Sequence, residues 1–288
     1  MSRRVVVLSW GGKFTRRLLG VLHQRGTPAD ALVLYAPILT RGPGMLRPLA
    51  ARARRRLDPS YRRGARRVVF TAPLNHPRMV RDLRAEAPDV VVLATCSLLE
   101  PAVVEIPKLG VLNTHPGLLP WVRGNGPFAN ALLRGVPLGC TTLWIDRGID
   151  TGPVVERRLL PVAEGDSARA LGDRFYDLWV TMTADAIAAA AAGHDLPRAP
   201  QERRFALART VTGAGELARV DALLAEGAAH ALFERWRPFC TPDLRLPPEA
   251  DARIAAAGLD ENVPLPKRPS SAPVADDPHP AAGPRADG

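Results

Sequence analysis

Short apolar runs alternate along the chain with longer segments in which apolar residues recur every three or four positions. Continuous runs such as those at residues 5–9 and 90–94 are typical of parallel strands buried on both faces. Strands are expected at residues 5–9, 31–35, 68–71, 90–94, 109–113, 139–146 and 154–160. In segment 139–146 polar and apolar side chains alternate, which predicts a strand with one exposed face.

Segments with helical periodicity separate these runs. A long helix is expected after Ser167, which follows Asp166 and is a favourable capping residue. Its apolar stripe consists of Leu171, Phe175, Leu178 and Met182. Further helices are expected at residues 14–25, 40–67, 77–87, 128–134, 216–226 and 231–236. A short helix is also expected to start at Glu100-Pro101, since Pro is favourable in the first helical turn. The alternation of strands and helices predicts an α/β fold, a three-layer Rossmann-like domain with a mostly parallel sheet.

The domain organisation follows from a change in pattern along the 288 residues. Residues 1–195 form the predicted catalytic domain, and residues 196–260 form a helical extension. Residues 261–288 consist mainly of Pro, Ala, Asp and Ser without apolar periodicity, so this tail is expected to be disordered.

The net charge of +10 is concentrated in one segment, because eight arginines lie between Arg52 and Arg67. A solvated arginine-rich segment is one interpretation, and contact with a phosphate-bearing substrate or with RNA is the other. Tyr61 is the only aromatic residue among these arginines, which gives little support for stacking on single-stranded RNA.

Cysteine usage and the first residues indicate the compartment. Cys96, Cys140 and Cys240 are far apart and form neither a metal-binding pattern nor a disulfide framework, so a reducing environment is expected and no metal is predicted. The first apolar run, residues 5–8, is too short for a signal peptide or a membrane span. We therefore expect a cytoplasmic protein that does not enter a membrane.

Candidate chemistry is concentrated after the fifth predicted strand. Asn113 and His115 are two residues apart, so a strand would place both side chains on one face. Asp150 lies in a Gly/Asp segment that must turn tightly and can aim a carboxylate at the imidazole. Such a trio suits acyl transfer to an amine. Asn113 and His115 would stabilise the oxyanion, while Asp150 would orient His115 and take part in proton transfer.

Two other features have competing interpretations. Asp146 is the rival carboxylate to Asp150, and its alternative role is an Asx-type bond to the backbone of the turn. Gly11, Gly12 and Lys13 precede a helix and can present N–H groups to a substrate phosphate, although a plain strand-to-helix turn is the alternative.

Three separated pieces of sequence resemble the folate-dependent formyltransferase family: residues 113–120 (NTHPGLLP), Arg123-Gly124, and residues 148–153 (GIDTGP). The resemblance implies that Asn113, His115 and Asp150 are catalytic. It also implies that backbone groups of two loops bind the pterin of 10-formyltetrahydrofolate. These loop residues are Cys96, Ser97, Leu98, Asp146, Arg147, Gly148 and Ile149.

The resemblance extends well over residues 68–161 and loosely over the first strand and helix. It implies that the strand carrying Asn113 and His115 runs against its neighbours. Gly117 departs from the family pattern, since many members have serine there, and the departure affects a local hydrogen bond. The irregular loop 116–126 is expected to line the mouth of the site, where Arg123, Gly124 and Asn125 could meet substrate.

The function implied is N-formyl transfer from 10-formyltetrahydrofolate to a primary amine of a small molecule, such as an amino sugar nucleotide or an amino-acid derivative. A methionyl-tRNA formyltransferase-like enzyme is one alternative, but residues 200–260 lack the alternating strands of the C-terminal barrel of such enzymes. A formyltetrahydrofolate hydrolase usually has an N-terminal regulatory domain, and none precedes residue 5. A catalytically silent folate- or nucleotide-binding protein is disfavoured by the intact trio. The oligomeric state is left open, and an oligomer is compatible with the sequence.

Overall fold

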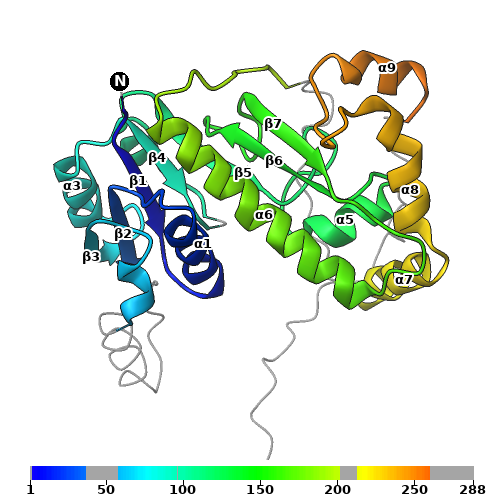
Figure 1. Cartoon of the computed structure of the whole chain (residues 1–288), viewed down its shortest axis with the longest axis horizontal. Coiled ribbons are helices and arrows are strands. Elements are labelled where there is room, and N and C mark those ends of the chain that lie inside the picture. Colours follow the sequence, from blue (N-terminus) through cyan, green and yellow to red (C-terminus); the bar gives the residue numbers. More distant parts are fainter. Residues whose placement is uncertain (1, 37–57, 96, 202–212, 260–288) are drawn as a thin grey trace, which may run out of the picture.

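A single seven-stranded sheet organises the computed structural model, which describes residues 2–36, 58–95, 97–201 and 213–259 (Figure 1). The strand order is β3-β2-β1-β4-β5-β6-β7. The first five strands along the chain are parallel, and β6 is antiparallel to β5 and β7. The strands are β1 (Val5–Ser9), β2 (Ala31–Ala36), β3 (Val68–Pro73), β4 (Val90–Leu93), β5 (Gly110–His115), β6 (Gly139–Trp144) and β7 (Val154–Leu159).

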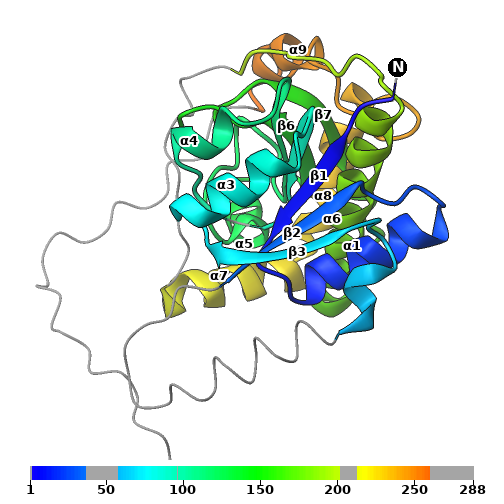
Figure 2. The same ribbon diagram turned by 90° about the vertical axis from the view of Figure 1, so that its left-hand side faces the viewer.

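Helices cover both faces of the sheet. Because side chains alternate along a strand, Val5 and Val7 pack beneath α1 and α6, whereas Val6 and Leu8 pack beneath α3 and α4. Figure 2 shows these helices on opposite sides of the sheet. The helices are α1 (Lys13–Gln24), α3 (Pro77–Ala85), α4 (Pro101–Val104), α5 (Pro127–Leu133), α6 (Ala168–Ala191), α7 (Ala214–Ala225), α8 (Ala228–Trp236) and α9 (Ala250–Ala256), with 3-10 turns η1 (Pro59–Arg62) and η3 (Arg237–Phe239).

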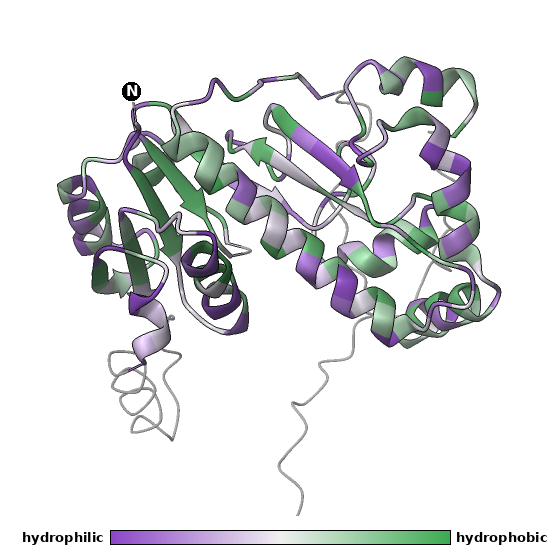
Figure 3. Ribbon diagram, viewed as in Figure 1, coloured by the Kyte–Doolittle hydropathy of each residue, from purple (hydrophilic) through white to green (hydrophobic). Residues whose placement is uncertain are grey.

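This arrangement confirms the predicted α/β fold with three layers and a mostly parallel sheet. The central parallel strands are hydrophobic along their length, and the helices carry hydrophilic residues on their outer sides (Figure 3). Both features follow from burial of strands between two helical layers. Among the described residues, no helix has the length and apolarity needed to cross a membrane.

A third core lies at the other end of the molecule, where α7, α8 and α9 pack against the loop that follows β5. Trp121 of that loop meets Trp236 of α8 edge to face, with ring centroids 5.0 Å apart. The buried Arg157 of β7 donates hydrogen bonds to the carbonyl oxygens of Leu119 and Pro247. The helical extension thus shares one core with the segment that carries the candidate site.

Two sequence predictions need correction. Strand β6 is buried at every position and not half-exposed, because α6 covers one face and the loop after β5 covers the other. Its polar Thr141 is satisfied there, accepting a hydrogen bond from the N–H of Leu119 and donating one to the carbonyl oxygen of Gly117. The orientation of β5 also differs, since it runs parallel to β4 and against β6 alone.

The predicted helix at residues 40–67 lies mainly outside the described residues. Its described end is the 3-10 turn η1, capped by Asp58, whose carboxylate accepts a hydrogen bond from the N–H of Ser60. Four of the eight arginines of the cluster, those at positions 52–56, and the predicted tail at 261–288 likewise fall outside the described residues.

Candidate active site

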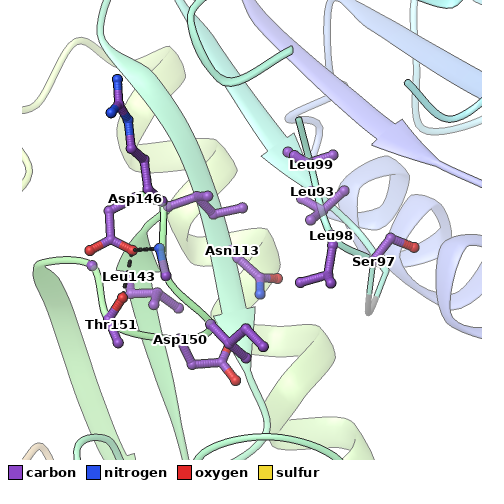
Figure 4. A pocket seen from close by; sticks show the side chains of 14 residues that line it. Leu93, Ser97, Leu98, Leu99, Asn113, Leu143, Asp146, Asp150 and Thr151 are labelled. Atoms are coloured by element: carbon purple, nitrogen blue, oxygen red, sulfur yellow. Dashed lines mark hydrogen bonds between the residues drawn. The ribbon is translucent and has the colours of Figure 1, made fainter. Parts of the chain in front are cut away.

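Strand β5 carries two members of the predicted trio. Asn113 and His115 alternate with Thr114, so both side chains lie on one face of the sheet, and β5 ends at His115. The amide of Asn113 points into a cavity of about 250 Å³ over β5 and the end of β4 (Figure 4). The cavity lining consists of Leu93, Ser97, Leu98, Leu99, Asn113, Leu143 and residues 145–152.

The third member, Asp150, reaches this strand from the loop between β6 and β7. Its Oδ2 lies 3.5 Å from Nδ1 of His115 and accepts a hydrogen bond of 3.1 Å from the backbone N–H of Gly124. Asp150 has a φ of +55°, a left-handed conformation that is uncommon for a residue other than glycine. The structure therefore brings the imidazole and the carboxylate together, although 35 positions separate them.

The other imidazole nitrogen of His115 faces the backbone. Its Nε2 lies 3.0 Å from the carbonyl oxygen of Val122. A carbonyl oxygen only accepts, so Nε2 carries the hydrogen and the neutral ring keeps its lone pair on Nδ1, toward Asp150. Burial lowers the pKa of His115 below its usual value, and this effect outweighs the opposing attraction of the Asp150 carboxylate. The neutral imidazole thus presents a proton acceptor beside a carboxylate.

Gly117 leaves the space that this histidine occupies. A Cβ atom at Gly117 would lie 2.8 Å from Nε2 of His115 and 3.0 Å from Cγ1 of Val122. Contacts that short would force the ring or the loop to move.

Asp146, the rival carboxylate, closes the turn that carries Asp150. Its Oδ1 accepts hydrogen bonds from the backbone N–H of Gly148 at 2.9 Å and from Oγ1 of Thr151 at 2.7 Å (Figure 4). This is the Asx-type role that the sequence left open for Asp146. The two carboxylates of one loop therefore have different surroundings, and Asp150 is the one beside His115.

The two loops predicted to hold a pterin face each other across the cavity. Ser97 and Leu98 lie on one side and the segment 146–149 on the other, with Asn113 between them (Figure 4). Cys96 lies outside the described residues. Leu98 and Ile149 are 69% and 47% exposed, which places two large apolar side chains at the mouth of a small cavity. Such walls with nearby peptide groups suit a flat heteroaromatic ring.

The predicted substrate-binding residues do not line this cavity. Gly11 donates its N–H to Oγ of Ser9 at 3.0 Å, and Gly12 donates to the hydroxyl group of Tyr61 at 3.3 Å, so the turn satisfies these N–H groups internally. The ammonium group of Lys13 lies 5.1 Å from the ring centroid of Tyr176.

Arg123, Gly124 and Asn125 lie on the loop behind Asp150. Arg123 is only 1% exposed, and its Nε donates a hydrogen bond of 3.1 Å to the carbonyl oxygen of Asp150. Burial lowers the pKa of its guanidinium group. Asn125 is exposed, and its carbonyl oxygen accepts a hydrogen bond from Nδ2 of Asn130. Arg123 and Gly124 thus contact Asp150 directly.

Some contacts of the site were not predicted from sequence. Nε2 of Gln201 donates to the carbonyl oxygens of Asp150 and Gly152, and Nε1 of Trp179 donates to that of Thr114, between Asn113 and His115. These partners are about 50 or more positions apart, and no local motif marks them. Only the packing of the folded chain reveals these contacts.

Comparison with known proteins agrees with this architecture. The family model described as Formyl transferase matches residues 3–187. A methionyl-tRNA formyltransferase from Chloroflexus aggregans is 36% identical over 137 residues, covering 47% of this chain and 44% of that protein. The one from Ralstonia nicotianae is 32% identical over 218 residues, covering 74% of this chain and 65% of that protein. The matching part thus spans about half to two thirds of these relatives.

A solved structure shows the same fold. A 4-N formyltransferase from Francisella tularensis superposes with a TM-score of 0.51 at 16% identity, covering 73% of this chain and 76% of that one. Similarity at this level of identity concerns the fold alone. The family match over more than half of the sequence is stronger, and it shows that this chain belongs to the formyl transferase family of one-carbon transferases.

Proposed function

We propose that this chain is an N-formyltransferase that moves the formyl group of 10-formyltetrahydrofolate to a primary amine of a small molecule. The observation that carries the proposal is the pair of His115 Nδ1 and Asp150 Oδ2, 3.5 Å apart beside the cavity into which Asn113 points. A proton acceptor, a carboxylate and an amide donor are the groups that amine formylation requires.

His115 and Asp150 would take the proton of the attacking amine. The hydrogen bond to Val122 fixes the hydrogen on Nε2, and the lowered pKa of His115 keeps the ring neutral at neutral pH. Nδ1 is then free to accept the proton. The imidazolium formed would have its new N–H beside the Asp150 carboxylate, which stabilises the positive charge. The new bond between the amine nitrogen and the formyl carbon would replace the C–N10 bond of the donor, and the proton would pass to N10 as tetrahydrofolate leaves.

Asn113 would stabilise the negative charge that develops on the formyl oxygen. Its amide is half-buried in the cavity wall, and it is the neutral donor of the trio. In this geometry His115 would not be a second donor, because its Nε2–H is bonded to Val122 and a proton on Nδ1 would face Asp150. Loss of one such donor costs about 3 kcal/mol of transition-state stabilisation in a well-studied protease.

The cavity residues fit the folate donor. Leu98 and Ile149 supply exposed apolar walls, and the segments 97–98 and 146–149 supply peptide groups at its edges. When bound, 10-formyltetrahydrofolate supplies a formyl group already activated for transfer. The residues of the chain hold the reactants in register, an effect worth about 7–11 kcal/mol in favourable cases.

Formylation of methionyl-tRNA is the second candidate, because the similar proteins from Chloroflexus aggregans and Ralstonia nicotianae carry that name. Residues 213–259 form α7, α8 and α9, which pack into the core beneath the loop after β5. This helical packing, in place of barrel strands in that segment, favours the small-molecule acceptor. Hydrolysis of the donor would use the same trio with water in place of the amine.

A turnover assay distinguishes these functions. The full chain is incubated with 10-formyltetrahydrofolate, and release of tetrahydrofolate is followed with no acceptor, with a panel of amino sugar nucleotides and amino acids, and with methionyl-tRNA. His115→Ala is the inactive control. Release that requires a small amine and disappears in the variant supports the proposal.

The other outcomes have distinct meanings. Release only with methionyl-tRNA, weakened steeply by salt, supports the tRNA enzyme, since binding to nucleic acid releases counterions. Release without any acceptor indicates a hydrolase. Donor binding without release in any condition indicates a silent binding protein, and the absence of both contradicts the proposal.

A further inference from the structure

We propose that Gln201 is a positioning residue that holds the carboxylate of Asp150 against His115. The proposal rests on the function proposed above for Asp150. Gln201 lies outside the segment 3–187 that matches the family model, and it follows the last helix of the three-layer domain. Its role is inferred from four hydrogen bonds and from the backbone conformation of Asp150.

The Gln201 amide bridges the turn on which Asp150 lies. Its Nε2 donates to the carbonyl oxygen of Gly152 at 2.6 Å and to that of Asp150 at 3.2 Å. Its Oε1 accepts a hydrogen bond of 2.8 Å from the guanidinium group of Arg123, whose Nε also donates to the Asp150 carbonyl oxygen. Arg123, Gln201 and the turn thereby form a closed set of hydrogen bonds.

Chemistry fixes the orientation of this amide. Arg123 only donates and the two carbonyl oxygens only accept, so the oxygen of Gln201 must face Arg123 and the nitrogen must face the turn. A side chain of equal length with no N–H group cannot replace it. Glutamate would keep the contact with Arg123 but would place an oxygen against two carbonyl oxygens.

Asp150 needs such support because of its backbone. A φ of +55° is unfavourable for a residue with a Cβ atom and persists only where the surroundings fix it. The Asp150 carbonyl oxygen is held by Arg123 and Gln201, and its carboxylate by the N–H of Gly124. Holding both ends of the residue determines where the carboxylate points.

The segment that carries Gln201 is itself anchored to the sheet. Ala199 exchanges two backbone hydrogen bonds with Val154, of 2.7 and 3.0 Å. Nε1 of Trp144 donates to the carbonyl oxygen of Pro197, and the guanidinium group of Arg198 lies 3.9 Å from the Trp144 ring centroid. Residues 197–199 are therefore fixed against β6 and β7, and this defines the position of Gln201 relative to the turn.

The test compares Gln201→Met with Gln24→Met, a matched control at the exposed end of α1. Turnover of 10-formyltetrahydrofolate is measured together with an NMR titration of the His115 imidazole. We expect kcat of Gln201→Met to fall about 10- to 100-fold, with KM for the donor within about threefold, because a shift of about 1 Å in a reacting group has effects of this size. Gln24→Met should behave as the unaltered chain.

The titration reports on Asp150 even if the chain formylates nothing. The Asp150 carboxylate raises the pKa of His115, and the charge of Arg123 lowers it. Displacement of the carboxylate in Gln201→Met should therefore move the pKa of His115 downward, in the same direction as Asp150→Asn. An unchanged pKa overturns the proposal, whether kcat falls or not. Absence of turnover in the unaltered chain contradicts the proposed function and leaves this result standing.

If Gln201→Met does not fold, Gln201→Glu replaces it in the test. It retains the pairing with Arg123 and the shape of the side chain, but it cannot donate to Asp150 and Gly152. Its kcat should fall by the same 10- to 100-fold. A kcat within threefold of the unaltered chain would overturn the proposal.

Discussion

Three glycine-containing segments were predicted to contact ligands, yet only the segment 146–152 lines the cavity. The turn formed by Gly11, Gly12 and Lys13 does not line it, and neither do the loop residues 123–125. Ser9 and Tyr61 occupy the N–H groups of the first two residues of that turn. In the loop after β6, Asp146 closes the turn and Asp150 remains beside His115. A glycine-containing turn can bind a ligand only where some of its polar groups are not already hydrogen-bonded within the protein.

The largest expected loss of kcat distinguishes Asp150 from Asp146, the two carboxylates of the loop between β6 and β7. Asp150→Asn should lower kcat about 1,000-fold, within the range for loss of a proton-transfer group, because an amide neither accepts the proton nor stabilises an imidazolium. Asp146→Asn is the matched control. Its side-chain oxygen can still accept from Gly148 and Thr151, so kcat should stay within about threefold. Equal losses in steady-state assays would show that the two carboxylates do not differ in role.

Gly117→Ser tests the position of His115. Its Cβ would lie 2.8 Å from Nε2, so the ring must move, and kcat should fall about 100-fold. Gly172→Ser in α6, where no atom lies within 4 Å of the added Cβ, controls for the substitution itself. Full activity of Gly117→Ser would show that Val122 does not fix the imidazole. Melting temperatures of both variants separate misplacement from unfolding.

The pH dependence of kcat tests the neutral imidazole. Protonation of His115 removes the proton acceptor, so kcat should fall as the pH decreases through the pKa of His115. Since burial lowers that pKa below the usual 6.5, activity should persist at pH 6.5 and decline about tenfold per pH unit only at lower values. A midpoint above 6.5, measured at saturating substrates, would contradict the neutral form.

The smallest effect is expected in the turn after β1. Lys13→Ala should leave kcat unchanged and KM within about twofold, even for an acceptor that carries phosphate, because the turn does not line the cavity and Ser9 and Tyr61 already bind its glycine N–H groups. An acceptor without phosphate should show no change in KM. Comparison of two acceptors that differ only in this group decides whether the turn contacts substrate at all.

The fold was predictable because its strands are continuous apolar runs such as that of β4, which need no distant information. The positions of Asn113 and His115 on one face followed from the period of a strand. The burial of β6 was not predictable from local sequence, because one of its faces is covered by the loop after β5 and the other by α6. Gln201 and Val122 act through an amide and a backbone carbonyl group, and neither has a signature in sequence.

The edge-to-face contact of Trp121 and Trp236 has a consequence for where this chain can be cut. Trp121 lies in the loop between His115 and Arg123, whereas Trp236 belongs to α8 in the helical extension, and both are buried. Truncation at residue 195 would remove Trp236 from beneath that loop, and loss of a buried tryptophan side chain lowers stability by about 3–5 kcal/mol. We therefore expect the segment 213–259 and the site loop to unfold together as one cooperative unit.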